Sequence, residues 1–251
     1  MKRIAVISEV HANLPALEAV LEDIHRHSID TILNLGDFVG YGPFPNEVVK
    51  RLAKPEIRNI LGNYDHKVLT WNEKKEKWKQ TKSPQKWLAF DWAFAHLSNE
   101  SREFLEGLPQ KRRILESNQR ILMVHGSPAS PNEHLGPDTP DDRLQILGSN
   151  TKADIVLCGH SHIPFERRIA STWFVNPGSV GRPDDGDPRA SYAILTLDVD
   201  HILIQHFRID YDIDRVVAAI RQAGLPDDFA RMVILGKSLN DITEGNGSVD
   251  E

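Results

Sequence analysis

Residues 4–21, IAVISEVHANLPALEAVL, set a pattern that predicts the architecture of the whole chain. A short apolar run breaks off at Glu9 and His11, and apolar residues at helical spacing follow it. Asn13 lies where it can cap that helix. Another apolar run, TILNLG at 31–36, comes next, so the sequence predicts two neighbouring parallel strands joined by a right-handed helical crossover.

Later segments extend this pattern and then change it. A helix is predicted at 46–54 and a third strand at 57–63. Strands then crowd together without long helices between them, at 120–128, 154–162, 173–180, 191–198 and 201–209. This crowding predicts a second, partly antiparallel sheet. An amphipathic segment at 212–225 predicts a last helix and residues 241–251 a polar tail, and we expect residues 1–251 to form a single domain.

The stretch from about 71 to 108 differs in composition and predicts a helical insertion or cap on that domain. It begins with the lysine-rich run WNEKKEKWKQTK at 71–82, which favours a solvated helix face over a basic patch beside an anionic ligand. The tryptophans of this stretch favour core packing over a platform for stacking bases. They are Trp78, Trp87 and Trp92.

Because of the overall charge, we do not expect a broad surface that binds nucleic acid. The 251 residues carry a formal net charge of −6, whereas proteins that grip a nucleic-acid backbone present many lysines and arginines. A small anionic substrate stays compatible, because a bound metal ion reverses the local sign of charge. The single cysteine, Cys158, fits a reducing compartment, and no apolar run is long enough to span a membrane. We expect a cytoplasmic protein, and nothing in the sequence predicts an oligomeric state.

Five short segments share one layout, in which a strand ends and polar side chains follow at once. In extended backbone, residues i and i+2 point to the same side, so such pairs are expected to converge. Parallel strands also gather their carboxyl ends at one edge of a sheet, where open α/β sheets bind ligands. Glycines stand beside these side chains, as expected where backbone turns sharply or approaches closely. The side chains are Glu9, His11, Asp37, Asn63, Asp65, His125, His160 and His162.

This mixture of carboxylate, amide oxygen and imidazole indicates a transition-metal site. It suits Zn²⁺, Mn²⁺, Fe or Ni²⁺ better than Ca²⁺, which prefers oxygen ligands throughout. Seven candidate ligands, the set above without Asp65, are too many for one tetrahedral ion. We therefore expect two divalent metal ions that share one carboxylate.

The ordered segments resemble the motif set of the calcineurin-like metallophosphoesterases, from Ile4 to about Gly181. Residues 176–195, NPGSVGRPDDGDPRASYAIL, resemble the bacterial YfcE-like phosphodiesterase branch of that superfamily. The resemblance implies an α/β fold, a four-layer α/β/β/α sandwich of two mixed β-sheets flanked by helices. It also implies hydrolysis of phosphate esters at a dinuclear metal centre, with a hydroxide bridging the two ions as the nucleophile.

The resemblance further implies how the ligands divide between the two ions. The first ion is assigned to Glu9, His11, Asp37 and His162. The second is assigned to Asp37, Asn63, His125 and His160, which makes Asp37 the bridging ligand. Catalytic roles are implied for Asn63, Tyr64, Asp65 and His125.

Glu9 departs from the family pattern, which usually has Asp at this position. Glu is longer by one methylene, about 1.5 Å of extra reach. It can serve as a ligand if its backbone lies farther back or if its side chain folds. We expect Glu9 to coordinate, with reduced or altered metal affinity at the first site.

Tyr64 is a second departure, because many relatives carry a His there that protonates the leaving group. A tyrosine with an ordinary pKa of about 10 is a poorer proton donor at neutral pH than an imidazole. We therefore expect a preference for good leaving groups, with His66 as an alternative acid. Four more polar residues are candidates for reading the substrate: Asn132, His134, Arg182 and Arg189.

The sequence leaves three functions open. We expect a metal-dependent phosphoesterase that acts on a phosphodiester, a nucleotide or another small phosphate ester. A phosphomonoesterase or a protein phosphatase is the alternative with the same chemistry. A catalytically weakened metal-binding interaction module is a different class, which the two departures favour and the otherwise complete ligand set opposes.

Overall fold

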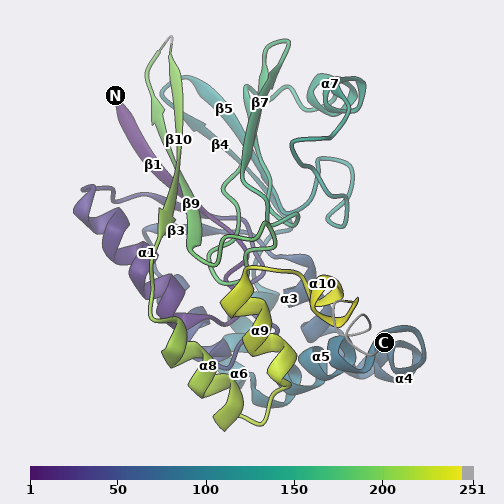
Figure 1. The fold of residues 1–251 in the computed structure, drawn as a ribbon. Coiled ribbons are helices and arrows are strands. Elements are labelled where there is room, and N and C mark those ends of the chain that lie inside the picture. The colour runs from purple at the N-terminus through teal and green to yellow at the C-terminus, as the bar shows by residue number, and fades with distance from the viewer. Residues whose placement is uncertain (200, 245–251) are drawn as a thin grey trace.

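Two five-stranded mixed sheets form the centre of the computed structural model, which describes residues 1–199 and 201–244 (Figure 1). The first sheet has the strand order β10-β9-β1-β2-β3 and the second the order β4-β5-β6-β8-β7. The first comprises β1 (Lys2–Ile7), β2 (Ile32–Asn34), β3 (Ile57–Asn59), β9 (Ala190–Leu197) and β10 (Ile202–Ile209). The second comprises β4 (Lys111–Glu116), β5 (Gln119–Val124), β6 (Ile155–Leu157), β7 (Phe165–Ile169) and β8 (Thr172–Asn176).

Helices flank this pair of sheets and gather at one end of it. They are α1 (Leu14–Arg26), α2 (Pro45–Leu52), α3 (Asn63–Leu69), α4 (Trp71–Thr81), α5 (Pro84–His96), α6 (Asn99–Glu106), α7 (Asp141–Ser149), α8 (Ile213–Gln222), α9 (Asp227–Leu235) and α10 (Leu239–Glu244). In Figure 1, α1 lies along the outside of the first sheet and α7 beside the second, while most of the others lie below the sheets. The predicted four-layer sandwich is confirmed.

Strand β1 shows how the sequence builds these layers. Successive side chains of a strand point to opposite faces. Ile4 and Val6 lie in the apolar cluster between the sheets, together with Met123 of β5. Ala5 and Ile7 belong to another cluster, which the apolar side of α1 completes. The apolar part of β1, residues 4–7, is therefore buried on both faces, as expected for parallel strands covered by helices.

The parallel strands place their carboxyl ends at one end of the sandwich. In the first sheet β1, β2 and β3 run parallel, and in the second β5, β6 and β8 run parallel. The remaining strands pair antiparallel at the edges or carry the chain back. The loops that follow the parallel strands therefore leave both sheets on the same side, facing the helices below.

The sequence failed to predict two edge strands, β4 and β7, and four short helices, α3, α7, α9 and α10. Strands β4 and β7 are half polar and alternate between exposed and partly buried positions, which weakens their apolar signal. A tight hairpin turn with positive φ at Ser117 and Asn118 joins β4 to β5. The prediction that the helix at 212–225 is the last one is wrong, because α9 and α10 follow it.

Helices α4 to α6 fill most of the region where we expected a helical insertion. Trp71 is buried at the centre of an aromatic cluster, with ring centroids 5.7 Å from Trp78 and 5.3 Å from Trp87. Trp92 stacks instead on His96. Trp78, Trp87 and Trp92 are partly buried and pack on neighbouring aromatic rings, whereas the status of the region as an insertion into a single domain stays a prediction.

The C-terminal end of the chain differs from the predicted polar tail. Residues 241–244 belong to α10, whose Leu239 and Ile242 are buried against α8 and α9. Residues 245–251 of that tail lie outside the described residues. Over 1–199 and 201–244, no helix has the length and apolarity needed to cross a membrane.

Candidate metal centre

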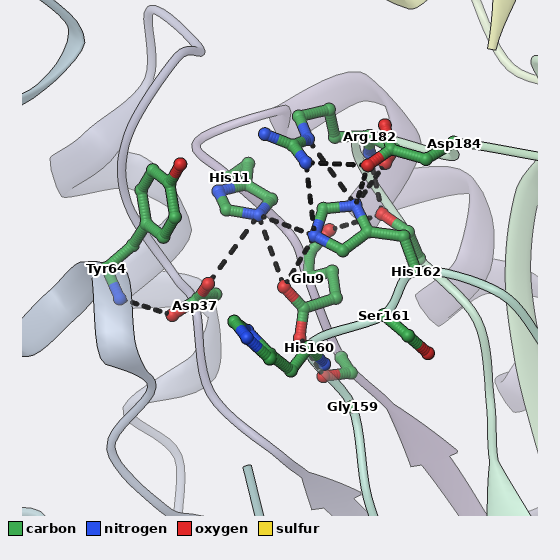
Figure 2. Close-up of polar contacts among 12 residues, drawn as sticks. Glu9, His11, Asp37, Tyr64, Gly159, His160, Ser161, His162, Arg182 and Asp184 are labelled. Atoms are coloured by element: carbon green, nitrogen blue, oxygen red, sulfur yellow. Dashed lines mark hydrogen bonds and ion pairs between the residues drawn. The ribbon is translucent and has the colours of Figure 1, made fainter. Parts of the chain in front are cut away.

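The predicted ligands all follow parallel strands, and Figure 2 shows Glu9, His11, Asp37, His160 and His162 gathered in one place. Three loops come from the first sheet and two from the second. Glu9 and His11 follow β1, Asp37 follows β2, Asn63 follows β3, His125 follows β5, and His160 and His162 follow β6. Sheet stacking therefore brings together residues that are distant in sequence.

These loops converge through turns, which corrects the expectation that extended backbone aims the paired side chains. Glu9 and His11 have φ values of 57° and 47°. His160 and His162 have φ values of 66° and 62°, and Asp37 has one of 58°. Left-handed backbone is unfavourable for residues other than glycine and persists where the surrounding structure enforces it. The alternation of a strand therefore does not explain the convergence.

Two glycines allow the loops to approach so closely. A Cβ atom on Gly62 would lie 2.1 Å from Oδ1 of Asp37. A Cβ atom on Gly159 would lie 2.2 Å from Oγ of Ser8. Both separations are far shorter than a van der Waals contact, so any larger residue would push the ligand loops apart.

Glu9 is completely buried at the middle of the site. Its Oε1 accepts hydrogen bonds from the Ser8 hydroxyl at 2.8 Å and from the backbone N–H of His160 at 2.7 Å. Its Oε2 lies 3.2 Å from Nε2 of His11 and 3.0 Å from Nε2 of His162. Burial raises the pKa of the Glu9 carboxyl, but the surrounding histidines outweigh burial and hold this pKa well below its ordinary value. The longer side chain thus reaches backbone with one oxygen and the histidines with the other.

Asp37 is the second buried carboxylate. Its Oδ1 accepts a hydrogen bond from the backbone N–H of Tyr64 at 2.8 Å. Its Oδ2 lies 3.7 Å from Nε2 of His11 and 3.5 Å from Nε2 of His125. Burial, and then the charge of Glu9, raise the pKa of Asp37 well above its ordinary value. Two carboxylates in one buried site repel, and a cation between them would remove that repulsion.

Two groups of three side chains bring their ligand atoms within 4.8 Å of one another. They are Glu9, His11 and His162, and Glu9, Asp37 and His125. The first group contains three of the four residues expected at the first metal ion. Glu9 belongs to both groups, whereas the sequence predicted Asp37 as the shared carboxylate. The Oδ2 atom of Asp37 nevertheless approaches one histidine of each group.

The three histidines of these groups present Nε2 to the carboxylates. Each Nδ1 lies near a backbone carbonyl oxygen, which only accepts hydrogen bonds, so Nδ1 carries the proton and Nε2 offers a lone pair. The distances are 3.3 Å from His11 to Val39, 2.9 Å from His125 to Leu35 and 2.5 Å from His162 to Arg182. Burial lowers the pKa of His11 to about 4 and also lowers the pKa of His125. Neutral imidazoles of this orientation are suited to bind a metal.

His160 and Asn63 lie beside these groups. The backbone of His160 is bonded to Glu9, and its ring lies 5.1 Å from that of His125. The ring is in neither group of three. Asn63 donates from Nδ2 to Oδ1 of Asn132 at 3.0 Å, which leaves Oδ1 of Asn63 as the atom available to a metal.

The unpaired atoms of the site fit divalent cations. Among the described residues, four ligand atoms are buried without a hydrogen-bond partner: Glu9 Oε2, Asp37 Oδ2, Asn63 Oδ1 and His125 Nε2. Each buried acceptor without a partner costs about 1 to 3 kcal/mol. Carboxylate oxygens and imidazole lone pairs that face each other are all acceptors, so a positive ion satisfies them together. Their mixture of oxygen and nitrogen suits a divalent transition metal.

Asp65, for which a catalytic role stays a prediction, is held by the backbone of two loops. It is completely buried, and its oxygens accept hydrogen bonds from four backbone N–H groups. These belong to Asp37 at 2.9 Å, Phe38 at 2.8 Å, Val39 at 3.2 Å and Gly62 at 3.0 Å. Burial raises the pKa of Asp65 to about 7, against the effect of these four bonds. With both oxygens engaged, Asp65 fastens the Asp37 loop to the start of α3.

Tyr64 binds Asp37 through its backbone, and its hydroxyl lies at the opposite end of the side chain (Figure 2). The hydroxyl lies 2.9 Å from the hydroxyl of Tyr41. The ring meets that of His11 edge-on, with centroids 5.2 Å apart. Burial, followed by the neighbouring Tyr41, raises the pKa of Tyr64 well above its ordinary value. Tyr64 therefore stays protonated and can donate a hydrogen bond.

Arg182 and Asp184 lie beside His162 and link it to the C-terminal helices. Nη2 of Arg182 lies 2.7 Å from Oδ2 of Asp184 and 3.4 Å from Nε2 of His162. The guanidinium carbon lies 4.7 Å from the ring centroid of Tyr41, which packs against Phe229 of α9. The sequence singled out Arg182 and missed Asp184 and Tyr41. The only sequence signal for Asp184 is its place two residues after Arg182 in the same polar loop.

Of the other three residues predicted to contact the substrate, two lie at the site. Asn132 contacts Asn63, and the ring of His134 lies 4.2 Å from that of His160, so both lie at the site. Arg189 instead forms an exposed ion pair with Asp187. The alternative acid, His66, is exposed.

Comparisons with known proteins agree with this geometry. The chain matches the calcineurin-like phosphoesterase superfamily domain over residues 1–200. Uncharacterized protein MJ0912 of Methanocaldococcus jannaschii is 35% identical, over 93% of this chain and 98% of the relative. Phosphodiesterase YfcE of Escherichia coli is 28% identical, over 79% of this chain and 90% of the relative.

A solved structure extends the agreement to the fold. The crystal structure of a metallophosphoesterase from Sphaerobacter thermophilus is similar with a TM-score of 0.76 and 32% identity, over 94% of this chain and 99% of that one. The family match includes every loop that carries a predicted metal ligand. The chain therefore belongs to the calcineurin-like phosphoesterase superfamily.

Proposed function

We propose that this protein is a metal-dependent hydrolase of phosphodiesters, nucleotides or other small phosphate esters. The observation that supports this function is the set of buried acceptors around Glu9 and Asp37, which needs positive charge to be stable. When bound, two divalent ions would supply an activated water at neutral pH and neutralise charge on the phosphoryl oxygens.

The residues divide between the two ions as the geometry suggests. Glu9, His11 and His162 would hold one ion. Glu9, Asp37 and His125, with Asn63 beside them, would hold the other. His160 is proposed as a ligand through its ring, next to that of His125.

Other residues of the chain would bind and orient the substrate. The guanidinium of Arg182 lies next to His162 and is suited to bind phosphoryl oxygens through two N–H groups. Asp184 and the Tyr41 ring hold that guanidinium in place. Tyr64 keeps its proton on the phenol oxygen, so esters with good leaving groups, such as aryl esters, are the preferred substrates.

The proposal is tested with chelator-treated protein reconstituted separately with Mn²⁺, Zn²⁺, Fe²⁺ and Ni²⁺. Each form is assayed on bis-p-nitrophenyl phosphate and p-nitrophenyl phosphate, with metal content measured in parallel. We expect metal-dependent turnover that is faster with the diester. Faster turnover of the monoester would assign the phosphomonoesterase alternative. Bound metal without turnover of either ester would favour the interaction module.

A further inference from the structure

Three lysines near the metal centre have no ion-pair partner among the described residues. Nζ of Lys67, on α3, lies 4.7 Å from the ring centroid of Tyr64. Nζ of Lys74 and of Lys82 lie 5.9 Å and 5.2 Å from the ring centroid of Trp78. Within 1–199 and 201–244, these three ammonium groups contact aromatic rings but form no hydrogen bond or ion pair. We call Lys67, Lys74 and Lys82 the lysine cluster.

The members of the lysine cluster are close enough to oppose one another's charge. Lys67 and Lys82 approach the same ring, with Nζ 5.9 Å and 5.7 Å from the centroid of Phe90. Burial lowers the pKa of Lys67, the charge of Asp37 opposes this, and the charges of Lys82 and Lys86 lower the pKa further. Lys86 differs from the cluster, because it donates a hydrogen bond to Asn240 at 3.0 Å. Such an arrangement is stabilised when an anion lies among the ammonium groups.

A groove connects the lysine cluster to the metal centre. It has a volume of about 320 Å³, and its lining includes Asn63, Lys67, Lys74, Trp78 and Asn132. Asn63 offers its unpaired Oδ1 to the metal centre and so marks the end of the groove where the chemistry takes place. The volume is sufficient for a phosphorylated group of a small substrate.

Lys74 differs from the other lysines of α4 in its burial and in its position at the groove. Lys74 is half-buried and lines the groove, whereas Lys75, Lys77 and Lys79 are exposed on the same helix. The lysine-rich run therefore combines the two alternatives that the sequence offered, a solvated helix face and a basic patch. One side of α4 is a solvated face, and the other is a basic surface beside the active site.

We propose that the groove beside Asn63 is a subsite for a second phosphate of the substrate, bound by Lys67 and Lys74. This inference rests on the proposed phosphoesterase function and narrows its substrates to phosphate esters that carry another phosphate away from the reacting one. Ammonium groups on flexible stems bind such a phosphate as point charges.

Two chromogenic esters that differ by one remote phosphate test the subsite. They are thymidine 5′-(4-nitrophenyl phosphate) and its 3′-phosphorylated form, which release the same nitrophenolate. For the metal-loaded wild type we expect kcat/KM to be about tenfold higher for the 3′-phosphorylated ester, the gain typical of a charge-assisted contact. In Lys74→Ala and Lys67→Met this preference should fall to about onefold. The matched control Lys77→Ala, on the exposed side of α4, should keep the wild-type preference.

A binding measurement tests the proposed phosphate subsite without requiring turnover. Lysines of the wild-type protein are acetylated in the presence of thymidine 3′,5′-bisphosphate or thymidine 5′-monophosphate, and modification at each lysine is measured by mass spectrometry. We expect the bisphosphate to protect Lys67 and Lys74 at least about threefold more than the monophosphate does, and to leave Lys77 unprotected.

The outcomes separate the subsite from the underlying activity. Equal kcat/KM for the two esters, or equal protection by the two nucleotides, would overturn the subsite while leaving the phosphoesterase function standing. Selective protection without hydrolysis of either ester would support the subsite and overturn the proposed function. A preference that survives in Lys74→Ala and Lys67→Met would show that the phosphate binds elsewhere, which also overturns the inference.

Discussion

The metal centre and the groove beside Asn63 are neighbours, but their side chains are held in opposite ways. In the centre, Glu9, His11 and His125 are at most 1% exposed, and each is fixed by contacts to backbone. In the groove, the ammonium groups of Lys67 and Lys74 touch only aromatic rings among the described residues. Chemistry requires atoms held to within fractions of an ångström, whereas recognition of a charge tolerates flexible side chains. We call the metal centre the rigid side, because its side chains are fixed by hydrogen bonds. We call the groove the adjustable side, because its lysines are not.

The strongest test of this contrast removes a charge from the rigid side. Asp37→Ala is expected to lower kcat/KM on bis-p-nitrophenyl phosphate about 1,000-fold and to reduce bound metal. After chelation, the variant should melt no lower than the wild type, because burial and Glu9 make the Asp37 charge unfavourable in the folded protein. Metal analysis and thermal denaturation measure both effects. Lys74→Ala, from the adjustable side, is the control and should bind the wild-type amount of metal.

A smaller change tests how precisely the Glu9 carboxylate must be placed in the metal centre. The family pattern alone predicts lower affinity with Glu, but the contacts of Glu9 reverse this expectation: Glu9→Asp should weaken metal binding about 10- to 100-fold, as the loss of a supporting contact does. The shorter side chain cannot keep Oε1 on the His160 backbone while Oε2 faces His11. Competition with a metal chelator measures the affinity. Equal affinity and equal turnover in the variant would show that the added methylene is not used.

In the absence of metal, lowering the pH should lower the free energy of unfolding through the histidines of the metal centre. His11 has a pKa of about 4 in the folded protein against an ordinary value of 6.5. Between these values the unfolded chain binds a proton that the folded chain does not, so the free energy of unfolding falls as the pH is lowered from 6.5 to about 4. The contribution of His11 is at most about 1.4 kcal/mol per pH unit. Urea unfolding of chelator-treated protein should show a smaller fall in His11→Gln, and an equal fall would contradict the assignment.

The smallest effect is expected at the boundary between the two regions. Tyr64→Phe should change kcat less than about threefold and lower stability by about 1 kcal/mol, because its hydroxyl pairs with Tyr41. Tyr41→Phe removes the same contact from the other side and is the matched control. Turnover of an alkyl ester with a poor leaving group is the sensitive assay. A loss above about tenfold in Tyr64→Phe alone would assign the phenol as the proton donor.

Much of the site could be predicted because its ligands lie in short local motifs. The position of Glu9, His11, Asp37 and His125 just after apolar runs reflects sheet topology, which periodicity reveals. The reason given for their convergence was wrong, because the left-handed φ values of Glu9 and His11 depend on contacts with distant loops. Local sequence does not contain those contacts.

The remaining differences have the same physical origin. Asp65 reads as a catalytic carboxylate, and only the fold shows that four backbone N–H groups occupy its oxygens. The central place of Glu9 depends on how the two sheets stack, as does the proximity of Asp184 to His162. Strands β4 and β7 were missed because edge strands need no apolar pattern on their outer side.

The bond between Glu9 and the backbone of His160 joins positions 151 residues apart. At synthesis rates of about 5 to 20 residues per second, roughly 8 to 30 s separate the emergence of these two residues from the ribosome. Closing so long a loop carries an entropic cost that docking of the strands must offset first. The early half of the centre therefore exists for many seconds in a nascent chain that has no complete binding site. A metal ion that needs ligands from both halves would therefore bind only after the two sheets have met.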